Sequence, residues 1–144
     1  MPLDSNVADR AKSKLLKSYL AALRRFRSLV LKPEKPLSDL NAIELHDFRR
    51  SVRRLRYLRD LLLSRRAAVK DPLVTRLVVV QDALGEVQNR RAMRDLFVNA
   101  PKDLWLDELE PRLRGEEKRW LGVARMRLRR LQSYLRRRRS LTLD

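Results

Sequence analysis

The chain has 144 residues, a length that favours one domain, and its 35 Lys and Arg against 18 Asp and Glu leave a net charge of +17. With no Cys, one His and three Gly, it offers no disulfide framework, no thiolate nucleophile, no Cys- or His-rich metal site and no glycine-rich phosphate loop. The hydrophobic share of 44% argues against disorder, so the excess of cations indicates a folded protein with a polyanionic partner.

Apolar residues recur at three- and four-residue spacing, which predicts long helices rather than strands. The first helix is expected over about residues 7–31 and ends where Pro33 and Pro36 forbid its continuation. The second is expected over about 42–66, after the capping residues Ser38, Asp39 or Asn41.

The third helix is expected over about 72–98, because Asp71-Pro72 supplies a cap followed by a proline in the first turn. Residues 78–80 alone could form a strand, but the apolar stripe continues far beyond them. After a break at 99–101 and a short helical turn within 102–109, the fourth helix covers about 111–138.

Each helix carries an apolar stripe, so the chain is predicted to be all-α: one domain over residues 1–144, an antiparallel four-helix bundle of long amphipathic helices. The expected core residues are Leu15, Leu16, Tyr19, Leu20, Leu23, Phe26 and Val30; Leu45, Phe48, Val52, Leu55, Leu58 and Leu62; Leu73, Leu77, Val80, Leu84 and Val87; Leu113, Trp120, Ala124, Leu128, Leu131 and Leu135.

The second helix concentrates cations on the face opposite its apolar stripe. At about 100° per residue, Arg49, Arg50, Arg53 and Arg56 fall within roughly 80° of His46, and Arg54 lies at the edge of that arc. Arg59 is an exception, because it falls on the apolar side, where the sequence offers no reason for a charge.

Two ordinary explanations compete with a functional one: a lone His is often a core residue, and an arginine-rich face is often only solvated. His46, however, lies in the middle of the polar face, and Asp47 is the only acid between His46 and Arg59. Because like charges at helical spacing repel, such a face is more easily maintained when an anion occupies it.

Weaker basic rows are expected on the first and last helices, at Lys14, Lys17 and Arg25 and at Arg125 and Arg129. Rows several turns long suit an extended, regularly charged polymer better than a compact metabolite. Arginine binds phosphate oxygens with two N–H groups at once, whereas lysine offers a point charge.

Residues 45–57, from Leu45 to Tyr57, resemble the signature helix of the CHAD (conserved histidine α-helical) domains, with His46, Arg49, Arg53, Arg54 and Arg56 at the basic positions. Residues 81–87 within the segment 77–91 resemble the second block of that family. The sequence departs from the family pattern at Gln88-Asn89, where Asn or Arg followed by Asp is usual.

This resemblance implies a helical domain that binds inorganic polyphosphate along its basic surface. Family members commonly hold two four-helix bundles related by a pseudo-twofold axis, and this chain looks like one half of that arrangement. The resemblance thus predicts that two copies pair as a homodimer, which is also the commonest closed assembly.

The function expected from the sequence is therefore non-catalytic polyphosphate binding, with no catalytic residue, metal or cofactor. Its predicted contact residues are His46, Arg49, Arg50, Arg53, Arg54 and Arg56, with Lys14, Lys17, Arg25, Arg125 and Arg129 beside them. Two alternatives stay open: sequence-nonspecific nucleic-acid binding, and an adaptor role on acidic granule or membrane surfaces that residues 136–139 would serve. The chain has no apolar run long enough to span a membrane, so a cytoplasmic protein is expected. The resemblance to the CHAD family adds an expected association with polyphosphate-containing granules.

Overall fold

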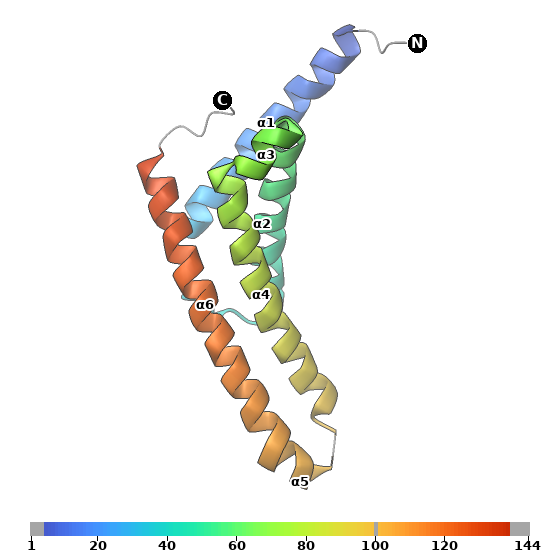
Figure 1. Ribbon diagram of the computed structural model, residues 1–144, viewed down its shortest axis with the longest axis vertical. Helices are drawn as coiled ribbons and strands as arrows, with labels where there is room; N and C mark the ends of the chain where they lie inside the picture. The colour runs from blue at the N-terminus through green and yellow to red at the C-terminus, as the bar shows by residue number, and fades with distance from the viewer. Residues whose placement is uncertain (1–4, 100, 139–144) are drawn as a thin grey trace.

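The computed structural model describes residues 5–99 and 101–138, and every regular element in this part of the chain is helical (Figure 1). The all-α prediction is therefore confirmed. The elements are α1 (Ser5–Leu31), a 3₁₀ turn η1 (Leu37–Asp39), α2 (Ala42–Leu62), α3 (Arg65–Lys70), α4 (Pro72–Phe97), α5 (Lys102–Leu104), a π-helical turn η2 (Trp105–Leu109) and α6 (Glu110–Arg137).

Side-chain caps set the helix boundaries. Asn41 and Glu44 form a capping box at the start of α2, in which Asn41 Oδ1 accepts from the Glu44 N–H at 2.8 Å. The second helix ends at Leu62 rather than at the predicted residue 66. Ser64 instead accepts a hydrogen bond from the Ala67 N–H and begins the separate helix α3, because its side chain replaces the backbone partner that a continuous helix would supply.

Consecutive long helices run in opposite directions, as Figure 1 shows. Helices α4 and α6 share the most extensive interface, and the lower half of this pair extends beyond α1 and α2. Helix α1 crosses the others obliquely and contacts α2 far more than α6 (Figure 1). The four long helices are thus present, while their arrangement as a four-helix bundle stays a prediction.

One apolar core joins the four long helices. Its fully buried members include Leu45 and Leu55 from α2, Leu77 and Leu84 from α4, and Leu131 from α6. All five core residues predicted for α4 are buried.

Two core predictions on α1 are wrong. Leu16 and Leu20 are 37% and 48% exposed. Leu16 precedes the buried part of α1, whose N-terminal end extends past the other helices (Figure 1), and Leu20 lies about 100° around the helix from the buried Tyr19. The buried side of α1 begins at Tyr19 and continues with Leu23, Phe26 and Val30.

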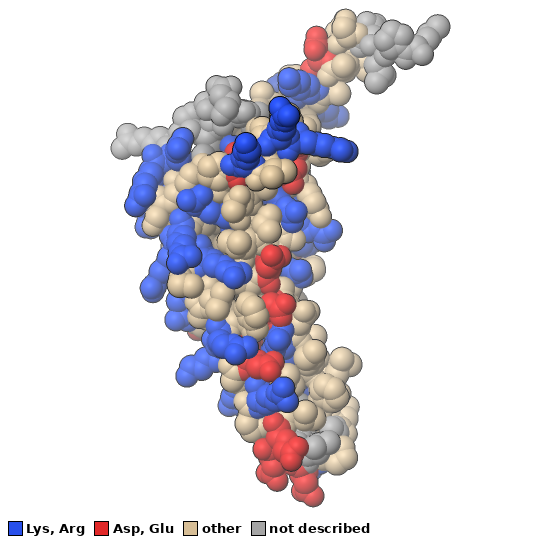
Figure 2. Space-filling model, in the orientation of Figure 1, with Lys and Arg blue, Asp and Glu red and all other residues tan. Residues whose placement is uncertain are grey.

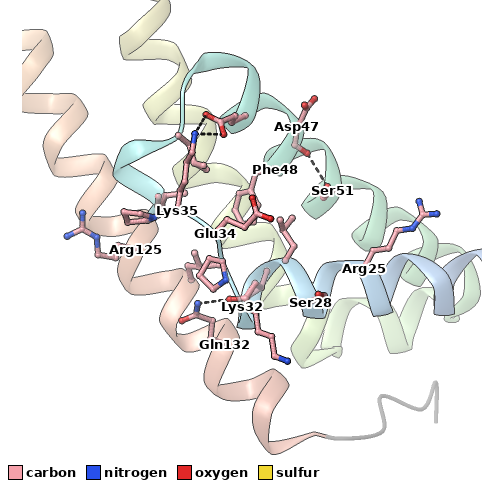
Figure 3. A pocket seen from close by; sticks show the side chains of 18 of the residues that line it. Arg25, Ser28, Lys32, Glu34, Lys35, Asp47, Phe48, Ser51, Arg125 and Gln132 are labelled. Carbon is pink, nitrogen blue, oxygen red and sulfur yellow. Dashed lines mark hydrogen bonds and ion pairs between the residues drawn. The ribbon is translucent and has the colours of Figure 1, made fainter.

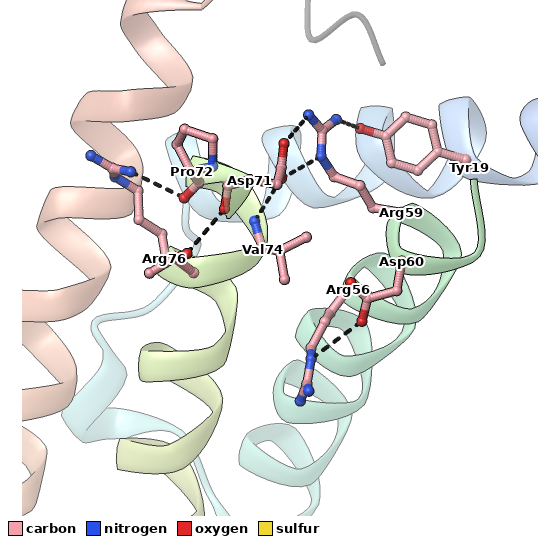
Figure 4. A network of polar contacts seen from close by, with 9 residues as sticks. Tyr19, Arg56, Arg59, Asp60, Asp71, Pro72, Val74 and Arg76 are labelled. Carbon is pink, nitrogen blue, oxygen red and sulfur yellow. Dashed lines mark hydrogen bonds and ion pairs between the residues drawn. The ribbon is translucent and has the colours of Figure 1, made fainter. Parts of the chain in front are cut away.

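The structure explains Arg59, the cation that the sequence placed on the apolar side of α2. Its side chain is only 4% exposed, and its guanidinium donates to both carboxylate oxygens of Asp71, at 2.7 and 2.8 Å (Figure 4). A further N–H donates to the hydroxyl of Tyr19. Asp71 also accepts from the Val74 N–H and so caps α4. This cluster ties α1, α2 and α4 together.

The pKa shifts of the cluster follow from these contacts. Burial alone would raise the pKa of Asp71, but the hydrogen bonds from Arg59 and from the Val74 N–H outweigh it and lower that pKa below its ordinary value. Burial likewise opposes the charge of Arg59, yet the hydrogen bond to Asp71 raises its pKa. Both groups are therefore charged at neutral pH, and each compensates the other.

Ion pairs hold the projecting half of the α4–α6 hairpin together. Arg90 contacts Glu116 at 3.1 Å, Arg91 contacts Glu117 at 2.7 Å, and Arg94 lies between Glu117 and Glu110. Glu110, at the start of α6, is thus half-buried and ion-paired. These carboxylates neutralise the arginines at the C-terminal end of α4.

Candidate functional site

Four basic side chains follow one side of α2: His46, Arg49, Arg53 and Arg56, here named the α2 stripe. They are spaced three, four and three residues apart, which places them on one side of the helix over about 15 Å. His46 and Arg53 are exposed, whereas Arg49 and Arg56 are half-buried against α4.

Neutral amides of α4 hold the two half-buried arginines. Arg49 Nη1 donates to Gln88 Oε1 at 2.9 Å, and Arg56 Nη1 donates to Gln81 Oε1 at 3.3 Å. An amide fixes a guanidinium without compensating its charge. Only Asp60, whose Oδ2 lies 3.7 Å from Arg56 Nε, brings a carboxylate to the stripe among the described residues. The stripe therefore keeps most of its positive charge for an external anion.

Gly85 provides the space in which Arg49 lies. A Cβ atom at this position would lie 3.0 Å from Arg49 Nη2 and 3.3 Å from its Cζ. A side chain at this position would require the Arg49 guanidinium to move by a few tenths of an ångström. The absence of a side chain at Gly85 is thus part of the geometry of the stripe.

Arg53 and Tyr57 form the exposed end of this surface. Arg53 Nε donates to the Tyr57 hydroxyl at 3.3 Å, and the guanidiniums of Arg53 and Arg56 lie 5.3 and 5.6 Å from the centre of the Tyr57 ring. These cation–π contacts orient both arginines along the helix. Arg50 and Arg54 are also exposed, on the outward side of α2.

The remaining predicted residues lie in two other places. Lys14 and Lys17 are exposed on the N-terminal half of α1, before its first buried residue. Arg25, Arg125 and Arg129 line a pocket of about 800 Å³ between α1, the α1–α2 connection, α2 and α6 (Figure 3). In Figure 3 the Arg25 and Arg125 side chains lie at opposite ends of this pocket.

The pocket has a mixed charge, unlike the α2 stripe. Glu34, Glu44 and Asp47 line it together with the cations, and Lys35 is paired with Glu44 at 3.0 Å. Its α2 wall is formed by residues such as Ser51, about 200° around the helix from Arg49. The structure thus divides the predicted residues between the stripe, the exposed Arg50 and Arg54 beside it, the pocket and the N-terminal half of α1, and does not join them into one continuous row.

Sequence reasoning missed Gln81 and Gln88 as partners of the stripe. Their seven-residue spacing, with Gly85 between them, places all three residues on one side of α4. That pattern was available in the sequence, but only the packing of α4 against α2 shows what it contacts. Within the described residues, no three His, Asp or Glu side chains converge as a metal site.

Taken together, the fold and this surface define an all-helical domain with an arginine-rich stripe on its second long helix. A family model described as CHAD domain matches residues 3–98 of the 144, and the chain therefore belongs to the CHAD domain family. The match ends within one residue of α4 and leaves α6 outside it. No curated protein and no solved structure matches the chain. None of the helices in the described ranges is long and apolar enough to cross a membrane.

Proposed function

We propose that this chain binds inorganic polyphosphate on the α2 stripe and does not transform it chemically. The observation that carries the proposal is the placement of Arg49 and Arg56, whose guanidiniums are held by the neutral amides of Gln88 and Gln81, with Asp60 beside Arg56 as the one carboxylate that reaches either of them among the described residues. Membership of the CHAD domain family is consistent with this ligand. A linear chain of phosphates would satisfy successive cations along the helix through charge-assisted hydrogen bonds.

The aromatic side chain at the stripe favours phosphate over nucleic acid. Single-stranded nucleic acids gain much of their affinity by stacking bases on aromatic rings. The Tyr57 ring is already engaged by Arg53 and Arg56, which lie within 5.6 Å of its centre. A base that stacked on this ring would have to compete with these two guanidiniums, whereas a phosphate chain could bind them where they lie. Pairing of two copies, which the family resemblance implies, stays a prediction.

A competition experiment tests the ligand class. Labelled long-chain polyphosphate bound to the protein is challenged with unlabelled polyphosphate, duplex DNA or an oligothymidylate at equal phosphate concentration and equal salt. Polyphosphate is expected to compete best, and its affinity should fall steeply as salt is raised because binding releases counterions. Equal or better competition by either nucleic acid would reject polyphosphate in favour of nucleic-acid binding.

Gly85→Ala provides a second test, of the geometry of the stripe. An alanine suits a helix interior better than glycine by about 0.5–1 kcal/mol, so this variant is expected to fold at least as stably as the wild type. Its Cβ would shift the Arg49 guanidinium by a few tenths of an ångström relative to Gln88, and polyphosphate binding is expected to weaken by less than the roughly tenfold that corresponds to losing one charged hydrogen bond of about 1.5 kcal/mol. Chemical denaturation and a polyphosphate titration measure the two effects. Gly122→Ala, where an added Cβ meets nothing within 4 Å, is the control.

A further inference from the structure

A second basic surface lies along α4 and α6, away from the α2 stripe. It is a groove of about 810 Å³, here named the α4–α6 groove, and no carboxylate is among its lining residues. Its arginines are Arg76, Arg127, Arg129, Arg130 and Arg137. Figure 2 shows basic side chains gathered over α6.

Neutral groups hold two of these arginines in place. Arg127 Nη1 donates to the backbone carbonyl of Val79 at 2.8 Å, and Arg76 Nη1 donates to that of Pro72 at 3.0 Å. The Arg76 guanidinium also lies 4.5 Å from the centre of the Tyr134 ring. Their positions are therefore fixed before any ligand binds.

The charge of the groove is uncompensated, in contrast to the lower half of the same hairpin. There Arg90, Arg91 and Arg94 are all paired with glutamates. Among the described residues, no ion pair reaches any of the five groove arginines. Like charges held this close repel each other, and a bound anion would remove that cost.

The groove is separate from the α2 stripe. On α4, Val79 lines the groove whereas Gln81 contacts Arg56 of the stripe. These two residues are two positions apart in the sequence, which places them about 200° apart around the helix. Asp82 is exposed on the face between them. Figure 2 shows acidic side chains along α4 beside the basic surface of α6. One straight anionic chain would therefore not continue from the stripe into the groove.

We propose that the α4–α6 groove is a second anion site, which binds short condensed phosphate chains independently of the α2 stripe. Several arginines around one concave surface suit the oxygens of successive phosphates, each of which a guanidinium can bind through two N–H groups. Tyr134, the only aromatic residue lining the groove, already has the guanidiniums of Arg76 and Arg138 at 4.5 and 5.8 Å from its ring centre, and a stacked base would have to compete with them. The choice of phosphate rests on the proposed function, whereas the site itself rests on the charge and placement of its own arginines.

The experiment measures tripolyphosphate binding by calorimetry in a protein whose stripe is already neutralised by Arg49→Gln, Arg53→Gln and Arg56→Gln. This protein is expected still to bind tripolyphosphate. Adding Arg130→Gln and Arg137→Gln should weaken that binding at least about tenfold, which corresponds to about 1.4 kcal/mol. The matched control adds Arg119→Gln and Arg136→Gln, which remove the same charge from exposed positions of α6 outside the groove.

Equal weakening by the two pairs of substitutions would overturn the groove site, since only net charge would then matter. An oligothymidylate that binds the groove as tightly as tripolyphosphate would overturn its ligand class. Failure of the proposed function gives a different result. The variant with Arg49→Gln, Arg53→Gln and Arg56→Gln would then keep wild-type affinity for long polyphosphate. Arg130→Gln and Arg137→Gln would still weaken the binding of tripolyphosphate. Because all four control and test arginines on α6 are exposed, unchanged thermal unfolding is expected to show that every variant folds.

Discussion

Arg59→Met is expected to lower the free energy of unfolding by about 3–5 kcal/mol, the usual cost of removing one partner from a buried ion pair. The substitution leaves the Asp71 carboxylate buried without its guanidinium and removes the donor to the Tyr19 hydroxyl. Helices α1, α2 and α4 lose their common polar contact. Chemical denaturation at neutral pH measures the loss, and Arg54→Met, an exposed arginine of the same helix, is the control with an expected change within about 0.5 kcal/mol.

Two further results separate a lost ion pair from lost packing. The double variant Arg59→Met and Asp71→Asn should recover part of the stability, because no unpaired charge is then buried and the asparagine can still cap α4. A double variant less stable than Arg59→Met alone would contradict this explanation.

The deficit of Arg59→Met should also depend on pH. In the wild type the pKa of Asp71 is lowered by folding. Its contribution to the free energy of unfolding is therefore fully present above the ordinary carboxyl pKa and is lost as the pH falls through the pKa of Asp71 in the folded protein. In the variant, the Asp71 carboxyl is buried without a cation, which raises its pKa. Protonation at lower pH then removes the cost of burying an unpaired charge. The difference in the free energy of unfolding between the wild type and Arg59→Met is expected to shrink as the pH falls from neutrality toward about 4. A difference that stays constant over this range would reject the ionic origin.

The triple variant Arg49→Gln, Arg53→Gln and Arg56→Gln is expected to bind long polyphosphate about 10²–10³-fold more weakly than the wild type. Each charged hydrogen bond contributes about 1.5–3 kcal/mol in isolation, and three neighbouring contacts to one polymer are not fully additive. The slope of log affinity against log salt should fall in magnitude by roughly 2–3, since each lost phosphate contact removes about 0.7–0.9 of counterion release. Titrations at several salt concentrations measure both quantities.

The control for the triple variant removes the same charge elsewhere. Arg65→Gln, Arg66→Gln and Lys70→Gln neutralise three exposed cations of the short helix α3. If affinity depends on placed guanidiniums, this control should change it far less than the stripe variant does. Equal losses in the two proteins would show that polyphosphate responds to total charge alone, and the α2 stripe would no longer be its site.

The sequence determined the helices and the stripe because both depend on local periodicity. Three- and four-residue spacing of apolar side chains, the cap at Asn41 and the Asp71-Pro72 start predicted the helices to within a few residues, apart from the break at Ser64. The same periodicity placed His46, Arg49, Arg53 and Arg56 on one side of α2. A helix fixes the angle between its own residues, so no tertiary information was needed for either prediction.

Tertiary structure decided which of the cations are compensated, because that depends on contacts between residues distant in the chain. Arg59 is paired with Asp71 across the core, and Arg90, Arg91 and Arg94 are paired with glutamates of α6. Arg49 and Arg56 meet only amides of α4, apart from the nearby Asp60. Lys14 and Lys17 are exposed on α1 before its first buried residue, and no hydrogen bond or ion pair joins them to the stripe among the described residues. In the sequence every arginine counts equally as one positive charge. How much each arginine contributes to the free energy of binding an external anion depends on the charged and polar partners that folding brings within a few ångströms of it.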